Sequence, residues 1–463
     1  MDSYRNRTRR PGAVALKLLA ACVLLSMVAP LRAAEEGAIV LDHTAPGFAQ
    51  RGFEIVAAAD AHGGSHLRTE ELTGAKFVRI PFGRAGRYDV HLHWGKVEDA
   101  TTDAPFAVRH AGGTAHQFFD QRDAPGWHFH GSYELSEGSY VQLSGVNADG
   151  PVVADAVKLV PTAPRVVERK AKSTLTPIEL NAGDELRFTL RNGEVRRVKL
   201  LATSAKILDG EPGQVRKYAF DATLEIDGEK HVFERFVPDQ RSFYEPLETN
   251  GLRLWLDAVT DIFTDDGGFM EEKGLATGTS CRPKRKARLV VNDVGDRICP
   301  EKLVWWYPEK NDRLDIANCY RGEDCWMGPY NGKLAHGGLD YNMKSGTPLF
   351  APIAFDDHWL FDSLEAGDNN NRWRGVRQWD DGSTWWLQAH HLNRMLEVER
   401  QPLAKGTKYA ETAGVRIGKH QHTHFVFRVF EEGEAYWIDP WILFWQTFRD
   451  ARETVAGTPL PTR

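Results

Sequence analysis

Short stretches of alternating apolar and polar residues, separated by Gly, Asp and Asn turns, recur along the whole chain. Examples are residues 88–92, 185–190 and 424–429. Successive side chains of a strand point to opposite faces, so this alternation predicts half-buried strands. Long stretches with a helical period are scarce. We therefore predict an all-β fold.

The length and two changes in composition indicate several domains. A chain of 463 residues suggests about three domains. A strand ends near Pro161 and Pro164, where a basic stretch follows, and a Gly-, Cys- and Lys-rich region covers residues 274–297. We expect a β-sandwich over residues 38–161, a β-rich, sandwich-like middle domain over 166–295, and a third domain over 300–450.

The N-terminus has the pattern of an export signal. Four arginines lie among residues 5–10, an apolar run covers residues 13–31, and Ala33 and Ala34 follow it. This order predicts a signal peptide over residues 1–34 and a periplasmic or extracellular protein. The alternatives are a membrane anchor, for which the run is short and is ended by Pro30, and a lipoprotein anchored at Cys22. The run continues past Cys22, which disfavours the second alternative.

Charge and cysteine content narrow the class further. The formal net charge of −6 gives no basic face of the kind that binds nucleic acid. Beyond the predicted signal peptide the chain has four cysteines, which allow three pairings in an oxidising compartment. We favour Cys281–Cys299 and Cys319–Cys325, which pair cysteines that are close in sequence. The alternative of a cysteine-rich zinc site lacks a CxxC pair.

The last third of the chain contains residues suited to bind zinc. A catalytic zinc site needs three protein ligands, neutral imidazoles or carboxylates, and a fourth position for water. His336 and Asp340 are separated by a Gly-Gly turn that allows both side chains to converge. His422 and His424 lie two apart, so on a strand both face one side. One of them is then expected to bind the metal while the other faces the substrate.

These residues form part of an ordered set of motifs. His336-x-x-x-Asp340 is followed by Gly-Thr-Pro-Leu-Phe-Ala-Pro (346–352), then by His391-Leu, then by His422-x-His424-Phe. Over residues 334–440 this set resembles the lysostaphin/LytM-type peptidoglycan endopeptidases. The resemblance implies a duplicated-hybrid-motif antiparallel β domain that binds Zn²⁺ and hydrolyses peptide bonds in peptidoglycan stem peptides or cross-bridges.

The resemblance also implies a role for each residue. His336, Asp340 and His424 match the zinc ligands, while His391 and His422 match the two histidines that orient the water and stabilise the oxyanion. Which of the two acts as general base stays open. His390 competes with His391 for its role, but Leu392 favours His391, and we expect His390 to point to the opposite face of the strand.

One segment departs from the family pattern. Between the second and third motifs the chain carries Asp356-Asp357-His358-Trp359 and residues 368–374, rich in Asn, Arg and Trp. We interpret residues 368–374 either as a hairpin loop with a solvated tip or as a groove wall that contacts glycan or stem peptide.

The first region resembles the carbohydrate-binding-like domain of golvesin and of xanthan lyases. The matching segments are residues 42–48, 82–90, 103–108, 126–127 and 154–159. The resemblance implies a β-sandwich that contacts polysaccharide. Four aromatic side chains either stack on sugars or fill the core, namely Trp94, Trp127, Phe118 and Phe119. We interpret two further His-x-His pairs, 91–93 and 128–130, as strand-surface residues without a metal.

Two other functions remain as alternatives. The first alternative is a non-catalytic protein that binds the cell wall or a polysaccharide. The second is a cell-wall carboxypeptidase or amidase. Both enzyme classes use His and Asp, but the spacings of His336, Asp340, His422 and His424 fit them less well.

Overall fold

A computed structural model describes residues 37–453, except for 72–74, 102–103, 112, 123–124, 146–147, 149, 212–213, 238–244, 264–282, 308–325, 327–328, 331–333, 362–370, 397 and 414–420. The expected signal peptide, Cys22, Cys281, Cys319 and Cys325 lie outside the described residues. The described part contains no helix that is both long enough and apolar enough to cross a membrane.

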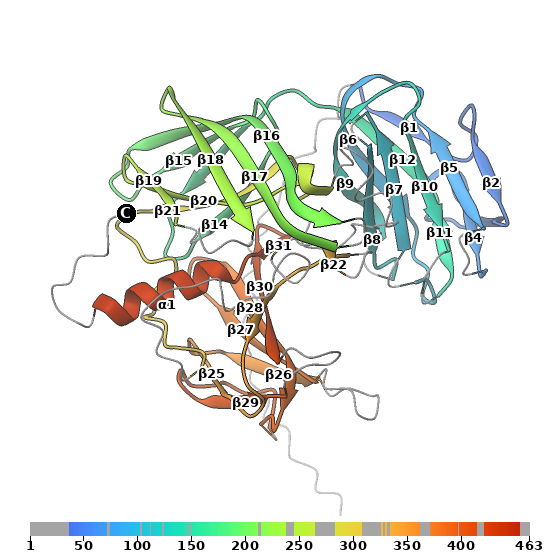
Figure 1. Cartoon of the computed structure of the whole chain (residues 1–463). Helices are drawn as coiled ribbons and strands as arrows, with labels where there is room; N and C mark the ends of the chain where they lie inside the picture. Colours follow the sequence, from blue (N-terminus) through green and yellow to red (C-terminus); the bar gives the residue numbers. More distant parts are fainter. Residues whose placement is uncertain are drawn as a thin grey trace, which may run out of the picture. The chain divides into compact units, whose positions relative to one another are not determined.

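The described elements are almost all strands (Figure 1), which confirms the predicted all-β fold. The exceptions are the 3-10 helices η1 (His62–Gly64) and η2 (Thr260–Phe263) and the helix α1 (Trp441–Glu453). The sequence pattern did not predict the helix α1.

The N-terminal region is built from twelve strands in three sheets. Their orders are β1-β12-β6-β9, β2-β5-β10-β7-β8 and β11-β4-β3. The strands are β1 (Ile39–Leu41), β2 (Ala49–Arg51), β3 (Glu54–Ala57), β4 (Ser65–Thr69), β5 (Phe77–Pro81), β6 (Gly86–Trp94), β7 (Ala104–His110), β8 (Gly113–Phe119), β9 (Gly126–Leu135), β10 (Tyr140–Ser144), β11 (Val152–Ala154) and β12 (Ala156–Pro161). Apolar side chains of these strands form one hydrophobic cluster of their own, which includes Val90, Leu92 and Val108.

The middle region has two sheets, ordered β13-β15-β16-β17-β18 and β14-β21-β20-β19. Its strands are β13 (Val166–Lys170), β14 (Thr176–Leu180), β15 (Glu185–Thr189), β16 (Val195–Glu211), β17 (Gln214–Ile226), β18 (Glu229–Val237), β19 (Leu247–Thr249), β20 (Leu252–Val259) and β21 (Ala287–Asp293). Every residue of β20 is buried, including Arg253 and Asp257, whose side chains pair with Asn292 and Arg288.

The C-terminal region is dominated by one large sheet with the strand order β24-β30-β28-β27-β26. In the same sheet, β31 pairs with β30, and β29 pairs with both β25 and β28. The strands are β22 (Pro329–Tyr330), β23 (Leu334–Ala335), β24 (Leu339–Asn342), β25 (Pro348–Phe350), β26 (Asp357–Phe361), β27 (Asn371–Gln378), β28 (Thr384–Asn393), β29 (Lys408–Thr412), β30 (His422–Glu431) and β31 (Glu434–Ile438). Residues 371–374 therefore belong to a strand, so the hairpin-loop interpretation is wrong for them, while 368–370 lie outside the described residues.

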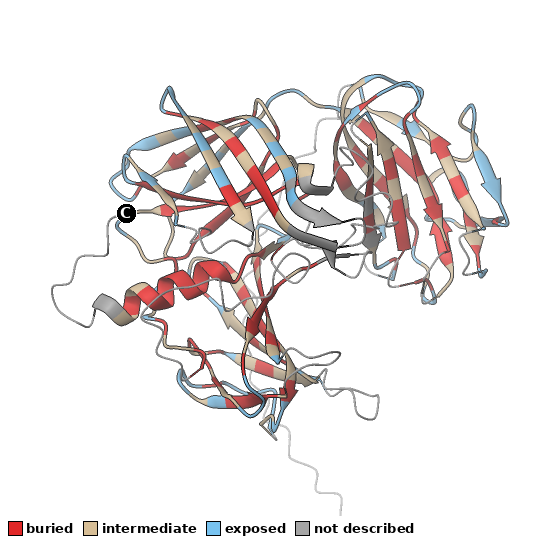
Figure 2. Ribbon diagram, viewed as in Figure 1, coloured by how far each residue is buried: buried red, intermediate tan, exposed pale blue. Residues whose placement is uncertain are grey.

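The helix α1 connects the cores of the middle and C-terminal regions. Its side chains are buried along most of its length (Figure 2). The Phe444 ring lies 5.6 Å from that of Phe425 on β30, and the Trp445 ring lies 5.2 Å from that of Trp255 on β20. The apolar residues of both regions consequently form a single hydrophobic cluster, separate from that of the N-terminal region.

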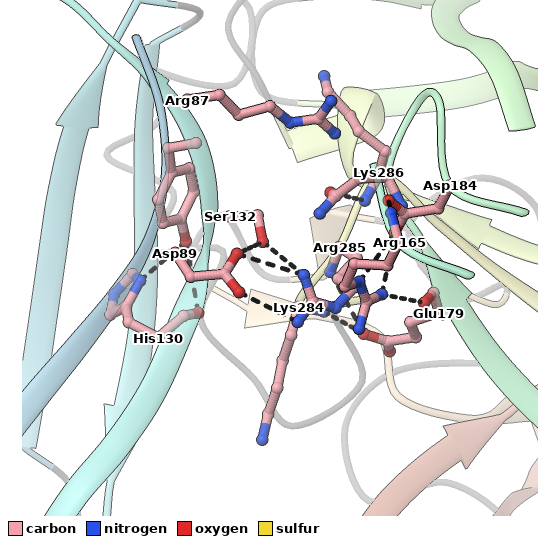
Figure 3. A network of polar contacts seen from close by, with 12 residues as sticks. Arg87, Asp89, His130, Ser132, Arg165, Glu179, Asp184, Lys284, Arg285 and Lys286 are labelled. Carbon is pink, nitrogen blue, oxygen red and sulfur yellow. Dashed lines mark hydrogen bonds and ion pairs between the residues drawn. The ribbon is translucent and has the colours of Figure 1, made fainter. Parts of the chain in front are cut away.

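Polar contacts also connect the N-terminal and middle regions (Figure 3). The Arg285 guanidinium lies 3.2 Å from an Asp89 carboxylate oxygen and donates to the Ser132 hydroxyl at 2.8 Å. The backbone N–H groups of Lys284 and Arg285 both donate to the Glu179 carboxylate. Two residues just before β21, Lys284 and Arg285, thus contact strands β6, β9 and β14.

The predicted Cys281–Cys299 bond is wrong, because Cys299 is a free thiol. It is fully buried in the hydrophobic cluster beside Ile298, and burial raises the pKa of its thiol to about 12. Such a thiol packs as a small apolar side chain.

Candidate metal centre

The register of β24 and β30 brings three of the predicted residues together. Asp340 pairs with His424, and Asn342 pairs with His422, across an antiparallel ladder. Directly opposed residues share a face of the sheet, as do residues two apart on one strand. Asp340, His422 and His424 therefore face one side, while the alternate residues of β30, Thr423, Phe425 and Phe427, are buried on the other side.

His336 reaches this face through the Gly-Gly turn before β24. A Cβ added to Gly338 would lie 2.4 Å from the Phe425 carbonyl oxygen and about 2.5 Å from the His424 ring. The backbone at Gly338 therefore approaches the ring of His424 more closely than any side chain allows. This close approach brings the His336 ring to 4.6 Å from that of His424.

The donor atoms of His336, Asp340 and His424 lie within 4.8 Å of one another. An Asp340 oxygen is 2.7 Å from His424 Nδ1 and 3.3 Å from His336 Nε2. Ligands bound tetrahedrally to zinc at ~2.0–2.1 Å are about 3.3 Å apart, so small adjustments are enough to accommodate the ion. Two imidazoles and one carboxylate, all largely buried, form a donor set that fits zinc.

The electrostatics of the site favour the protonation states that bind metal. Burial raises the pKa of Asp340, but the adjacent His336 and His424 more than offset this and hold it well below its usual value. Burial lowers the pKa of His424, with Asp340 opposing and His336 adding to the decrease. An ionised carboxylate beside a neutral imidazole is the state that a metal ligand requires.

A β-bulge places His391 next to this set. Asn371 pairs with Leu392 and Arg372 pairs with His390, so His391 is an extra residue on β28. It has a φ of 62°, in the left-handed region that residues other than glycine rarely adopt. Its ring lies 4.7 Å from that of His422 and 6.4 Å from that of His424. All five residues selected from the sequence are therefore neighbours.

His390 also belongs to this cluster, so the prediction that it faces away is wrong. Its ring is 4.8 Å from that of His424, the residue opposite it on β30. Burial lowers the pKa of His390 well below its usual value, and the charges of His424 and Arg372 add to the effect. The bulge explains the error, because it lets two consecutive residues face the same site. The sequence carries no signal for a bulge at a non-glycine residue.

Residues 56–161 match the family model of the Golvesin C-terminal domain. None of the curated proteins matches the chain. Three solved structures are similar over parts of their length. A Paenibacillus xanthan lyase is 28% identical over 27% of this chain and 13% of its own, with a TM-score of 0.26. Lysostaphin from Staphylococcus simulans is 20% identical over 34% of this chain and 58% of its own, with a TM-score of 0.24. A putative LytM from Ruminococcus gnavus is 18% identical over 33% and 61%, with a TM-score of 0.21. The chain thus spans less than two thirds of each of these structures.

The golvesin-like region uses its aromatic residues in two ways. Trp94 is buried and packs against Phe119, which supports the core interpretation for both. Trp127 is 36% exposed, with Lys158 5.1 Å from its ring. The side chain of Phe118 lies outside the described residues. Among these aromatics, Trp127 therefore keeps the sugar-stacking interpretation.

Two histidines of the His-x-His pairs in the golvesin-like region have polar partners within that region. His130 is fully buried, and its Nδ1 lies 2.8 Å from the Tyr133 hydroxyl. The surface prediction is wrong for this residue, because a hydrogen-bond partner makes its burial tolerable. His93 Nδ1 lies 2.6 Å from Asp155, a carboxylate that is distant in sequence.

Proposed function

We propose that this chain is an exported zinc endopeptidase that hydrolyses peptide bonds in peptidoglycan. One observation carries the proposal: His336, Asp340 and His424 converge on one face with two further imidazoles, His391 and His422, beside them. The cell-wall substrate is what the ordered motifs of residues 334–440 imply. These assignments of ligands, substrate and compartment are proposals of ours.

The chemistry divides among the residues as follows. A bound zinc ion acts as a Lewis acid that acidifies water and polarises the scissile carbonyl. Asp340 Oδ1 and His424 Nδ1, which are 2.7 Å apart, would both bind the ion, together with His336 Nε2 at 3.3 Å from the same Asp340 oxygen. His391 and His422 face the remaining side, where they accept the proton of the attacking water and donate a hydrogen bond to the developing oxyanion.

We propose in addition that the golvesin-like region contacts polysaccharide of the same wall. Its exposed Trp127 ring, flanked by Lys158 and by the His93 ring at 4.9 Å, offers an apolar face beside polar groups. Such a face suits the C–H and hydroxyl groups of a sugar. A pull-down of insoluble peptidoglycan that is weaker for Trp127→Ala than for the wild type supports this contact, and equal retention contradicts it.

The test of the proposed activity is mass spectrometry of peptidoglycan digested with and without a chelator. We expect cross-linked fragments to be cut at a peptide bond, and the cut to disappear with the chelator. The variant His422→Ala should keep about one zinc per chain and lose cleavage, whereas His336→Ala should lose both. A zinc-loaded wild type that leaves every cross-link intact contradicts the proposal.

The same measurement separates the alternative functions by product. Release of free D-alanine indicates a carboxypeptidase, and a stem peptide without sugar indicates an amidase. Retention of peptidoglycan without any product indicates a non-catalytic binding protein.

A further inference from the structure

The face of the large sheet that carries the proposed metal ligands on β24 and β30 continues over two more strands, β28 and β27. In register across the sheet, Asp340 lies opposite His424, His424 opposite His390, and His390 opposite Arg372. Neighbouring strands are about 4.8 Å apart, so Arg372 on β27 is roughly 10 Å from His424 along this row. Arg372 is exposed, and it lies on the same face as the metal site.

Arg374 occupies the next position of the same face. It pairs with Gln388, which itself lies two residues before His390 on β28. The alternate residues of these strands, among them Trp373 and Trp385, are buried in the core. Arg372 and Arg374 therefore extend the face that begins at the zinc ligands.

Aromatic rings hold the Arg374 guanidinium in place. Its central carbon lies 4.4 Å from the Trp386 ring and 5.0 Å from the rings of Trp359 and Phe361. When the side-chain amide of Gln388 is oriented with its oxygen towards Arg374, that oxygen accepts from Arg374 Nε at 2.9 Å and from one terminal nitrogen of the guanidinium at 3.0 Å. A guanidinium has five N–H groups, so three of them remain after this pair.

The charge of Arg374 has no acidic counterpart in the part of the chain that the structure describes. Burial lowers its pKa, and the charge of Arg372 adds to the decrease. Arg400 stacks on the same Trp359 ring at 4.4 Å, but it pairs with Asp357 at 3.4 Å. Two adjacent cations, one of them partly buried and without a carboxylate, form an environment that favours a bound anion.

We propose that Arg374 and Arg372 bind a carboxylate group of the substrate and make this enzyme selective for peptidoglycan peptides with a free carboxylate beside the scissile bond. The inference rests on the proposed function and adds the chemical class that the site prefers. The planar fork of an arginine matches a carboxylate in two-point hydrogen bonding, and stacking between rings fixes that fork before the substrate arrives.

The experiment compares two forms of one substrate. Muropeptides with free carboxylates are prepared, and a portion is amidated with carbodiimide and ammonia. The kcat/KM of the zinc-loaded full chain is measured on both forms. We expect the wild type to prefer the free carboxylate by about tenfold or more, mainly through KM. Arg374→Met and Arg372→Met should lower kcat/KM for the free form and leave the amidated form nearly unchanged, which removes the preference.

Arg400→Met is the matched control, because it removes a cation from the same Trp359 ring without changing the row beside the metal ligands. It should keep the wild-type preference. Equal cleavage of both forms by the wild type overturns the inference. So does an equal loss on both forms in Arg374→Met, which would indicate that Arg374 only supports the sheet.

A binding measurement separates this inference from the proposed activity. Two zinc-loaded proteins that cannot turn over the substrate, His422→Ala and the double variant His422→Ala with Arg374→Met, are titrated calorimetrically with the free and the amidated muropeptides. A preference for the free carboxylate that Arg374→Met abolishes supports the inference even if the wild type cuts neither form. Equal affinities overturn it even if the wild type is an active peptidase.

Discussion

The golvesin-like and C-terminal regions both carry a His-x-His pattern on a strand, yet among the described residues it is the C-terminal pattern that joins a cluster of three potential metal donors. On β30 the strand partner places Asp340 directly opposite His424, and Gly338 allows His336 to approach. In the golvesin-like region His93 finds the single carboxylate of Asp155, and among the described residues no third donor joins them. A His-x-His pattern on a strand is therefore insufficient to gather three donors: the register of β24 adds Asp340 to His424, and the Gly-Gly turn adds His336.

The two regions also differ in how their cores are built. The golvesin-like region buries its apolar side chains within its own strands. The C-terminal sheet shares its core with the middle region through α1, so the strands that carry the candidate ligands belong to a larger hydrophobic cluster. A rigid scaffold of this kind holds ligands in the geometry that metal binding requires.

Removal of a proposed ligand should have the largest effect. We expect His336→Ala or Asp340→Ala to lower zinc affinity by more than a hundredfold, because loss of supporting residues alone typically costs ~10–100-fold. Competition with a chromophoric chelator measures this. His93→Ala, which removes the histidine of the other region, should leave affinity and stoichiometry unchanged. An equal loss in His93→Ala would break the comparison.

Gly338→Ala should have the next largest effect. The new Cβ would collide with the Phe425 carbonyl and the His424 ring, so the turn must move and carry His336 with it. We expect zinc affinity to fall by about tenfold or more and the free energy of unfolding in urea to fall by about 1–3 kcal/mol. Gly138→Ala is the control, because open space surrounds that position. Unchanged zinc binding in Gly338→Ala would show that the close approach is dispensable.

The pH at which zinc is released should reflect the local electrostatics. Protons compete with the metal for His424, and burial lowers the pKa of this residue below the ordinary value of 6.5. The Asp340 carboxylate stays ionised far below neutrality. Lower pKa values mean fewer protons to displace, so we expect half of the zinc to be retained at a pH below about 6.5. Release of half of the zinc at pH 6.5 or above would contradict the lowered pKa values of His424 and Asp340.

A polar junction between the middle and C-terminal regions should contribute least. Asp381 accepts hydrogen bonds from Thr174 and Ser383, which outweigh its burial and lower its pKa to about 2. Its carboxylate therefore stabilises the fold above pH 3.8, and this contribution is lost as pH falls from 3.8 to about 2. Asp381→Asn should cost about 1 kcal/mol at pH 7 in urea unfolding and progressively less below pH 4. The exposed neighbour Asp380→Asn is the control, and a difference that is constant with pH would contradict the assignment.

The sequence predicted the parts of this structure that depend on local pattern. Alternation in residues 88–92 and 424–429 predicted strands, and the spacings of His336–Asp340 and His422–His424 predicted side chains on a common side. The clustering of all five selected residues agrees with the ordered motifs.

Other features depend on contacts that no local pattern encodes. The bulge that turns both His390 and His391 towards the site arises from the pairing of β28 with β27. The burial of Cys299 depends on packing between regions, which excluded one expected disulfide. The helix α1 was not predicted because it begins with a short apolar run, Trp441 to Trp445, which by its pattern alone is equally compatible with a buried strand. The strand character of Arg372 and Arg374 was likewise hidden in a polar stretch.

The most direct test of the metal centre is a zinc-edge anomalous difference map from crystals of the zinc-loaded chain. The account predicts one strong peak at about 2.0–2.2 Å from His336, Asp340 and His424, with His391 and His422 on its open side. A peak at His93 and Asp155 instead, or no peak beside Asp340, would contradict it.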